Sequence, residues 1–178
     1  MVEIVFESHA TTIDNENNIA SGINDAPLSN SGIKQAKELG QRYLTQNFHT
    51  IFCSDLQRSF KTAEIAFENR GFKIIQDLRL RECNYGSLNG AGKSEVDSVK
   101  GLYTENPFPA GESYAQTTQK MIEFLNEVAG NYESKRVMII GSRATQYALE
   151  NFINKIPLNQ AILASWKWQP GWVYYLKI

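Results

Sequence analysis

The chain has 178 residues, 42% of them hydrophobic, and a formal net charge of −1. This length fits one domain over residues 1–178, and a domain of this size buries about 70% of its unfolded surface, enough for a core without metal or disulfide staples. The small net charge provides no basic field that would attract nucleic acid. The sequence has no basic leader and no run of about 18 apolar residues, so we expect no membrane partner and a cytoplasmic location.

Short apolar segments alternate with helical patterns along the chain. Strands are expected at residues 2–6, 50–53, 72–75, 136–140 and 172–177, the first four almost continuously apolar, as is typical of parallel strands covered on both faces. Helices are expected at residues 31–46, 55–67 with Asp55 as cap, 113–128 with a capping box at Ser113, and 144–153. This alternation predicts an α/β fold of three layers, in which helices cover both faces of a mostly parallel sheet.

The segment from residue 78 to residue 111 has little periodicity and many Gly, Asn and Pro residues, which is typical of a loop region that faces a substrate. Near the end of the chain, Trp166, Trp168 and Trp172 surround a Pro-Gly turn. We interpret these tryptophans as packing around the last strand, with a ligand-lining role as the alternative. Cys53 and Cys83 form no metal-ligand pattern, so free thiols are expected.

Polar residues follow three of the expected strands. His9 comes after the first strand, Arg58 lies in the first turn of the helix after the second, and Ser142 follows the fourth. The carboxyl ends of parallel strands meet at one edge of a sheet, where α/β proteins bind ligands. We therefore expect these residues to converge on one pocket, together with Glu82.

The order of these motifs resembles the histidine phosphatase superfamily, which includes the cofactor-dependent phosphoglycerate mutases. The segments that carry the resemblance span most of the chain: Ser8-His9-Ala10-Thr11-Thr12-Ile13-Asp14-Asn15, Gly22 to Ser29, Ser54 to Arg58, Leu80-Arg81-Glu82, Ala110 to Ser113 and Ser142 to Thr145. The resemblance implies a phosphoglycerate mutase-like fold and phosphoryl transfer through a histidine.

The resemblance also implies roles for individual residues. His9 would be the nucleophile, Arg58 a phosphate clamp, Asn15 a further phosphate donor, and Glu82 the general acid that later activates water. Gly22 and Thr12 would bind the substrate, with the alternative that Asp25 and Pro27 only shape a turn before the first helix. No metal or other cofactor is implied.

Two positions depart from the family pattern in ways that affect chemistry. Ser8 stands where the family has an arginine, and Ser142 where it has a second histidine; both still offer hydroxyl donors to phosphate. His49, the only other histidine, precedes a strand and should lie at the opposite end of the sheet. Losing one preorganised oxyanion donor typically costs ~10²–10³ in rate, which predicts a slow catalyst rather than an inert protein.

Nearby cations could compensate locally, and the candidates are Arg143, Arg81 and Lys93. Each proposed site residue also has a purely structural interpretation. His9 could be a loop or capping residue, Arg58 could pair with Asp55, Glu82 could pair with Arg79 or Arg81, and Asn15 could form a turn.

The sequence thus favours a phosphomonoester hydrolase that acts on a small organic phosphate through phospho-His9. The ligand would be a small phosphorylated molecule or inorganic phosphate. The alternative is a non-catalytic module that binds a phospholigand or a protein and has kept the fold. Mutase activity is less favoured, because the region available to close the pocket is short.

Overall fold

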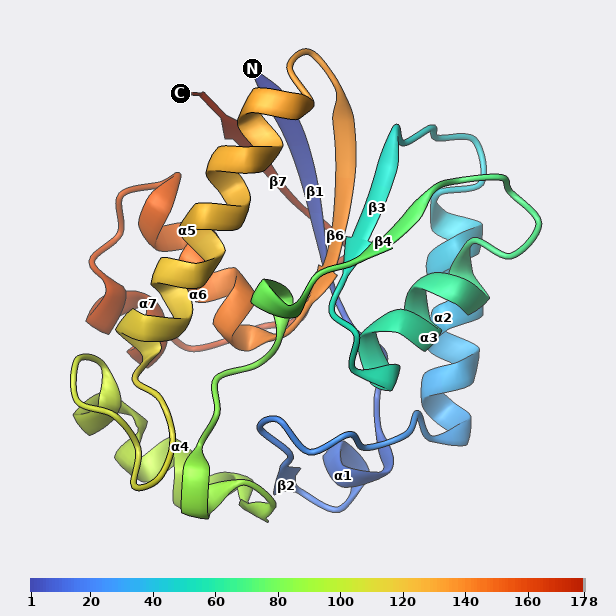
Figure 1. Cartoon of the computed structure of the whole chain (residues 1–178). Helices are drawn as coiled ribbons and strands as arrows, with labels where there is room; N and C mark the ends of the chain where they lie inside the picture. Colours follow the sequence, from blue (N-terminus) through green and yellow to red (C-terminus); the bar gives the residue numbers. More distant parts are fainter. Residues whose placement is uncertain (178) are drawn as a thin grey trace.

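The computed structural model describes residues 1–177, and within them five strands form the central sheet in the order β4-β3-β6-β1-β7 (Figure 1). In this order the first four strands (β4, β3, β6 and β1) are parallel to one another, and β7 pairs with β1 in the antiparallel direction. The strand bounds are Val2–Ser8 for β1, Thr50–Cys53 for β3, Ile74–Gln76 for β4, Arg136–Gly141 for β6 and Trp172–Leu176 for β7. The predicted α/β fold with a mostly parallel sheet is confirmed.

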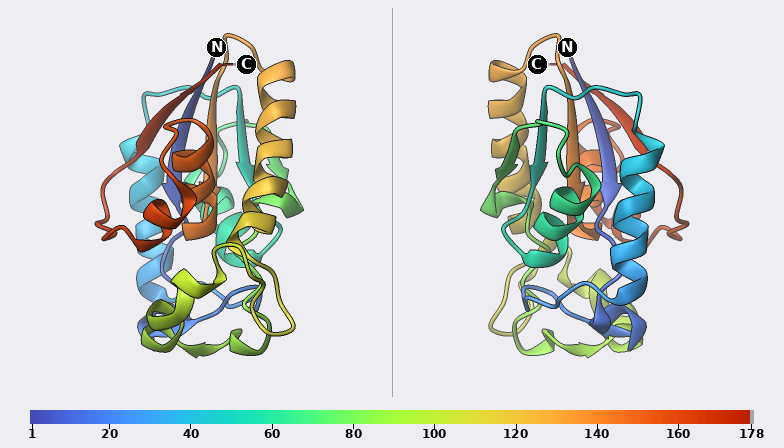
Figure 2. Two further views of the ribbon diagram at one scale, coloured as in Figure 1. Left: turned by 90° about the vertical axis from the view of Figure 1, so that its left-hand side faces the viewer. Right: turned by 90° about the vertical axis from the view of Figure 1, so that its right-hand side faces the viewer.

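Helices cover both faces of this sheet (Figures 1 and 2). Side chains alternate across a strand, so neighbouring residues of β1 enter different cores: Val5 packs with α2 and α3, whereas Ile4 and Phe6 pack with α5 and α6. The helix bounds are Asn30–Arg42 for α2, Gln57–Ala66 for α3, Tyr114–Asn131 for α5, Arg143–Phe152 for α6 and Leu158–Leu163 for α7.

Smaller elements lie beyond the carboxyl ends of the parallel strands (Figure 1). They are α1 (Ile13–Glu16), the β2–β5 pair (Ile19–Ala20 and Ala91–Gly92), α4 (Lys93–Val99) and short 3-10 helices at Leu78–Leu80, Gly86–Leu88 and Lys100–Tyr103. The segment expected to be irregular therefore contains a helix. Only Val96 of α4 is buried, which explains why no apolar period marked it.

The start of α3 differs from the prediction. Asp55 does not cap this helix, because its carboxylate pairs with Arg81. The N-cap residue is Leu56, and Asp25 accepts a hydrogen bond from the Gln57 amide at 2.7 Å instead. The predicted capping box at Ser113 is present. No helix in the described part of the chain is long and apolar enough to cross a membrane.

Candidate active site

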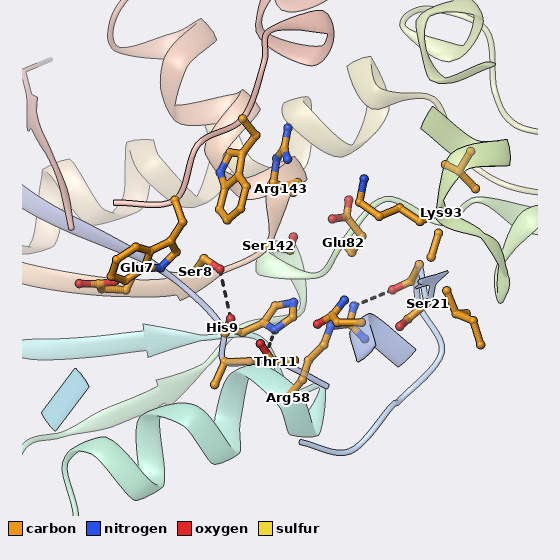
Figure 3. Close-up of a pocket in the computed structure, with 18 of the residues that line it drawn as sticks. Glu7, Ser8, His9, Thr11, Ser21, Arg58, Glu82, Lys93, Ser142 and Arg143 are labelled. Atoms are coloured by element: carbon orange, nitrogen blue, oxygen red, sulfur yellow. Dashed lines mark hydrogen bonds between the residues drawn. The ribbon is translucent and has the colours of Figure 1, made fainter. Parts of the chain in front are cut away.

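The loops that follow β1, β3, β4 and β6 surround one cavity of about 630 Å³. His9, Arg58, Glu82 and Ser142 all line it, as expected for residues at the carboxyl ends of parallel strands (Figure 3). His49 does not line this cavity; it lies at the start of β3, where its ring packs against Tyr132. The convergence predicted from the sequence is therefore present in the structure.

His9 is held at the end of β1 by two hydrogen bonds. Its backbone amide donates to the Gly141 carbonyl at 2.9 Å, and its ring Nδ1 lies 2.8 Å from the carbonyl oxygen of Ala10. A carbonyl can only accept, so Nδ1 carries the proton and Nε2 has the free lone pair. Burial, and then the positive charge of Arg58, lowers the pKa of His9 to about 4. The ring is therefore neutral at pH 7, as a nucleophile requires.

This shift predicts an unusual titration. The chain has two histidines, so proton NMR should show two imidazole signals, one of which titrates near pH 4 and disappears in His9→Ala. The folded-state pKa of His9 lies below its ordinary value of 6.5, so the unfolded chain binds this proton more readily between pH 6.5 and about 4. The contribution of His9 to stability should consequently fall as the pH decreases through that window. Two signals that both titrate near 6.5 would contradict the described environment.

Arg58 is 3% exposed and organises the loop between β2 and α2. Its Nη1 donates to the Asn24 carbonyl at 2.7 Å, and its Nη2 donates to the Gly22 carbonyl at 2.6 Å. A guanidinium has five N–H groups, so three are not used by these two carbonyls. Gly22 itself has φ +56°, and a Cβ there would lie 1.9 Å from the side-chain oxygen of Asn89. Glycine is therefore required at this bend of the cavity wall.

Glu82 lines the same cavity as Arg58 and is 9% exposed. Its Oε1 accepts a hydrogen bond from the Cys83 amide at 2.8 Å, and its Oε2 accepts one from the Ala144 amide at 3.4 Å. These bonds hold the carboxyl group beside the first turn of α6. Glu82 does not pair with Arg79 or Arg81, which was the structural alternative. Arg79 pairs with Asp77, and Arg81 pairs with Asp55.

The two serines that depart from the family pattern both line the cavity (Figure 3). The Ser8 hydroxyl donates to the His9 carbonyl at 3.1 Å. Ser142 is buried at the N-cap of α6, where its amide donates to the Thr145 hydroxyl at 3.1 Å. Neither side chain brings a positive charge to the cavity.

Asn15 and Thr12 form a reciprocal pair at the start of α1. The Thr12 amide donates to the Asn15 side-chain oxygen, and the Asn15 amide donates to the Thr12 hydroxyl, both at 3.0 Å. Asn15 lines the cavity, and this arrangement leaves its side-chain NH₂ group available as a donor. Thr12 is fully buried and is not among the lining residues, so it acts on the cavity through Asn15.

Of the three cations considered as local replacements, Arg143 and Lys93 line the cavity, whereas Arg81 does not. Lys93 pairs with Asp97. Arg143 donates from Nη2 to the Tyr147 hydroxyl at 2.9 Å, and its buried Nε has no hydrogen-bond partner among residues 1–177. Arg143 is thus the cation with unused donor capacity next to Ser142.

Several lining residues were not predicted from the sequence. Trp166 and Trp168 line the cavity, so their ligand-lining alternative is the one the geometry supports, whereas Trp172 packs on Phe6. The Pro-Gly turn beside these tryptophans was the sequence feature that could have indicated their place on the cavity wall. The other unpredicted lining residues include Arg42, Tyr85, Val96, Asp97, Lys100 and Tyr147.

The fold and the cavity together define an α/β protein in which a neutral histidine and a buried arginine line one cavity at the carboxyl ends of parallel strands. A comparison with protein families agrees: residues 4–170 match the model of the histidine phosphatase superfamily (branch 1). The chain therefore belongs to this superfamily.

Relatives with described activities include both mutases and phosphatases. The 2,3-bisphosphoglycerate-dependent phosphoglycerate mutase of Cytophaga hutchinsonii is 30% identical, over 86% of this chain and 78% of that protein. Phosphoserine phosphatase 1 of Hydrogenobacter thermophilus is 27% identical, over 84% of this chain and 74% of that protein. Membership of this family supports phosphoester hydrolase or mutase activity.

Solved structures agree on the fold. YhfR of Bacillus stearothermophilus superposes with a TM-score of 0.86 at 21% identity, covering 100% of this chain and 96% of that one. The phosphoglycerate mutase-like three-layer architecture expected from the sequence is therefore confirmed.

Proposed function

We propose that the chain is a phosphomonoester hydrolase that acts on a small organic phosphate through a phospho-His9 intermediate, at a reduced rate. The observation that carries this proposal is the fixed tautomer of His9, whose Nε2 lone pair is free in the cavity that Arg58 and Glu82 also line. A site that only binds anions would gain no affinity from a neutral imidazole and a carboxyl group beside the arginine.

In the first step, His9 Nε2 attacks phosphorus and forms an N–P bond. The bond between phosphorus and the ester oxygen breaks, and the protonated carboxyl group of Glu82 gives its proton to that leaving oxygen. Arg58 and the Asn15 amide group hold the phosphoryl oxygens, and the loop at Gly22 contacts the substrate beside Arg58. The Nδ1–H bond to Ala10 keeps the ring aligned and supports the positive charge that develops on it.

In the second step, the Glu82 carboxylate takes a proton from water. The resulting oxygen nucleophile attacks phosphorus, the N–P bond breaks, and inorganic phosphate leaves with His9 neutral again. Glu82 is protonated at the end, so the cycle closes. Hydrolysis is favoured over mutase activity because the segment between Asn84 and Gly111, which would have to close the cavity against water, is short.

The reduced rate follows from the two serines. Ser8 and Ser142 supply hydroxyl groups where the family supplies a guanidinium and an imidazole. The negative charge on the phosphoryl oxygens in the transition state is therefore stabilised by weaker hydrogen-bond donors. The unpartnered Nε of Arg143 offers partial compensation next to Ser142.

A second function is favoured by one specific observation. Arg58 already uses two N–H groups on the Gly22 and Asn24 carbonyls, which would suit a cavity that binds a phospholigand without turning it over. The two functions share the anion site and differ in whether phosphate is released.

Binding and turnover of phosphate analogues distinguish the two functions. Inorganic vanadate should inhibit hydrolysis of an aryl phosphate competitively, and Arg58→Gln should weaken vanadate affinity by about tenfold, because charge-assisted hydrogen bonds to the anion are lost. Arg81→Gln is the matched control, since Arg81 pairs with Asp55 outside the cavity and should leave vanadate affinity unchanged. Tight vanadate binding with no phosphate release over several hours would support the binding module instead. Equal affinity in the wild type and Arg58→Gln would remove Arg58 from the anion site.

A further inference from the structure

The cavity is larger than the phosphoryl site requires. Its volume of about 630 Å³ lies in the range of sites that bury whole drug-sized ligands, roughly 300–1,000 Å³. Beyond Ser8 and His9 it continues between α2 and the segment that precedes β7. The wall there is formed by Gln35, Glu38, Leu39, Arg42, Trp166 and Trp168.

Two tryptophan rings are held at this end of the cavity with their surfaces accessible. Trp166 and Trp168 are 39% and 57% exposed. Trp166 donates from Nε1 to the Gln146 side chain at 3.0 Å and stacks on Trp172, with ring centroids 6.4 Å apart. The guanidinium of Arg143 lies over the same ring, 5.1 Å from its centroid. Because the Trp166 ring is already fixed, a ligand that packs against its exposed part has little of the entropic cost of ordering this side chain.

Trp168 lies against an arginine that pairs with a buried carboxylate. The guanidinium of Arg42 lies 5.6 Å from the centre of the Trp168 ring and bonds to both carboxylate oxygens of Glu7 at 3.3 Å. Glu7 is 1% exposed and also accepts a hydrogen bond from Tyr43 at 2.7 Å. Arg42 is therefore engaged by a carboxylate and an aromatic face.

Of the remaining cations that line the cavity, the two lysines are paired with a carboxylate, whereas Arg143 bonds to the Tyr147 hydroxyl and lies over the Trp166 ring. Within residues 1–177, Lys93 and Lys100 both line the cavity, and both pair with Asp97. A carboxylate or a second phosphate on the substrate would have to displace one of these lysine pairs or the aromatic contacts of Arg143. The cavity thus offers one anion site at His9 and Arg58. Farther out its wall has two tryptophans, the acidic Glu38, and Arg42, which is already paired with Glu7.

We propose that the organic part of the substrate is a neutral aromatic group that lies against Trp168 and Trp166 while its single phosphate occupies the His9 site. This assignment of substrate class rests on the proposed hydrolase function for its turnover. The stacking contact itself requires only binding.

The test compares three alkyl phosphates whose leaving groups are chemically similar: phenylethyl phosphate, propyl phosphate and phosphoglycerate. We expect kcat/KM to be highest for phenylethyl phosphate. Trp168→Ala should lower the ratio of kcat/KM for phenylethyl phosphate to that for propyl phosphate by about five- to tenfold, and Trp168→Phe should restore part of it. Tyr175→Ala is the matched control, because Tyr175 is an exposed aromatic residue of β7 that does not line the cavity, and should leave the ratio unchanged.

Isothermal titration of the same three esters separates failure of this inference from failure of the hydrolase function. If no ester is hydrolysed but phenylethyl phosphate binds most tightly and Trp168→Ala removes the difference, the hydrolase function is wrong and the aromatic site stands. If the esters are hydrolysed with equal kcat/KM, if phosphoglycerate is preferred, or if Trp168→Ala leaves the ratio unchanged, the aromatic site is wrong.

Discussion

Replacing His9 with alanine should lower the rate of phosphate release from an aryl phosphate by ~10³-fold or more, because none of the other described residues that line the cavity is a histidine. The effect should appear in kcat, since the N–P bond forms only in the chemical step. His9 contributes little to substrate affinity in this scheme, so vanadate should still bind through Arg58 and Asn15. The measurement is continuous release of the aryl alcohol, with vanadate inhibition or titration on the same variant.

His49→Ala provides the matched control. It removes the only other histidine, whose ring packs on Tyr132 at the far end of β3. The rate of the His49 variant should equal that of the wild type. If His9→Ala retains most of the activity, the phosphohistidine route is wrong, and another nucleophile must be sought.

Restoring the two missing donors should raise the rate. Ser142 and Ser8 both line the cavity beside His9, so Ser142→His and Ser8→Arg each place a cationic or imidazole donor near the phosphoryl oxygens. We expect a gain of ~10²-fold for the better single replacement and a larger gain for the double replacement, because each donor acts on charge that develops in the transition state. Two donors within one cluster need not multiply their effects.

The double replacement combined with His9→Ala is the control for this gain. The gain should vanish in that triple variant, which would show that the gain depends on His9. A folded double variant with unchanged or lower activity would mean that His9 and Glu82 are not aligned for transfer, since misplacement by about 1 Å can cost ~10²-fold. That result would favour the non-catalytic binding module.

The sequence predicted the sheet well because its strands are buried on both faces. Continuous apolar runs marked the strands at residues 50–53 and 136–140 to within one residue. The site residues could be located because each follows such a strand, and the direction of parallel strands then brings His9, Arg58 and Ser142 to one edge.

The parts that the sequence did not predict depend on tertiary partners. Aspartate is a common helix-capping residue, but the Asp55 carboxylate pairs with Arg81, which is 26 positions farther along the chain. The helix α4 buries one apolar residue and so has no readable period. Trp166 and Trp168 look like packing residues, and only the path of the chain before β7 places them on the cavity wall.

Trapping the covalent intermediate tests the phosphohistidine mechanism most directly. The protein would be mixed with an aryl phosphate or an acyl phosphate carrying labelled phosphorus, quenched in base and in acid, and mapped by mass spectrometry. We predict label on His9 that survives base and is lost in acid, and none in His9→Ala. Label that survives acid and maps to the neighbouring Ser8, or phosphate release by the wild type without any label on His9, would contradict it.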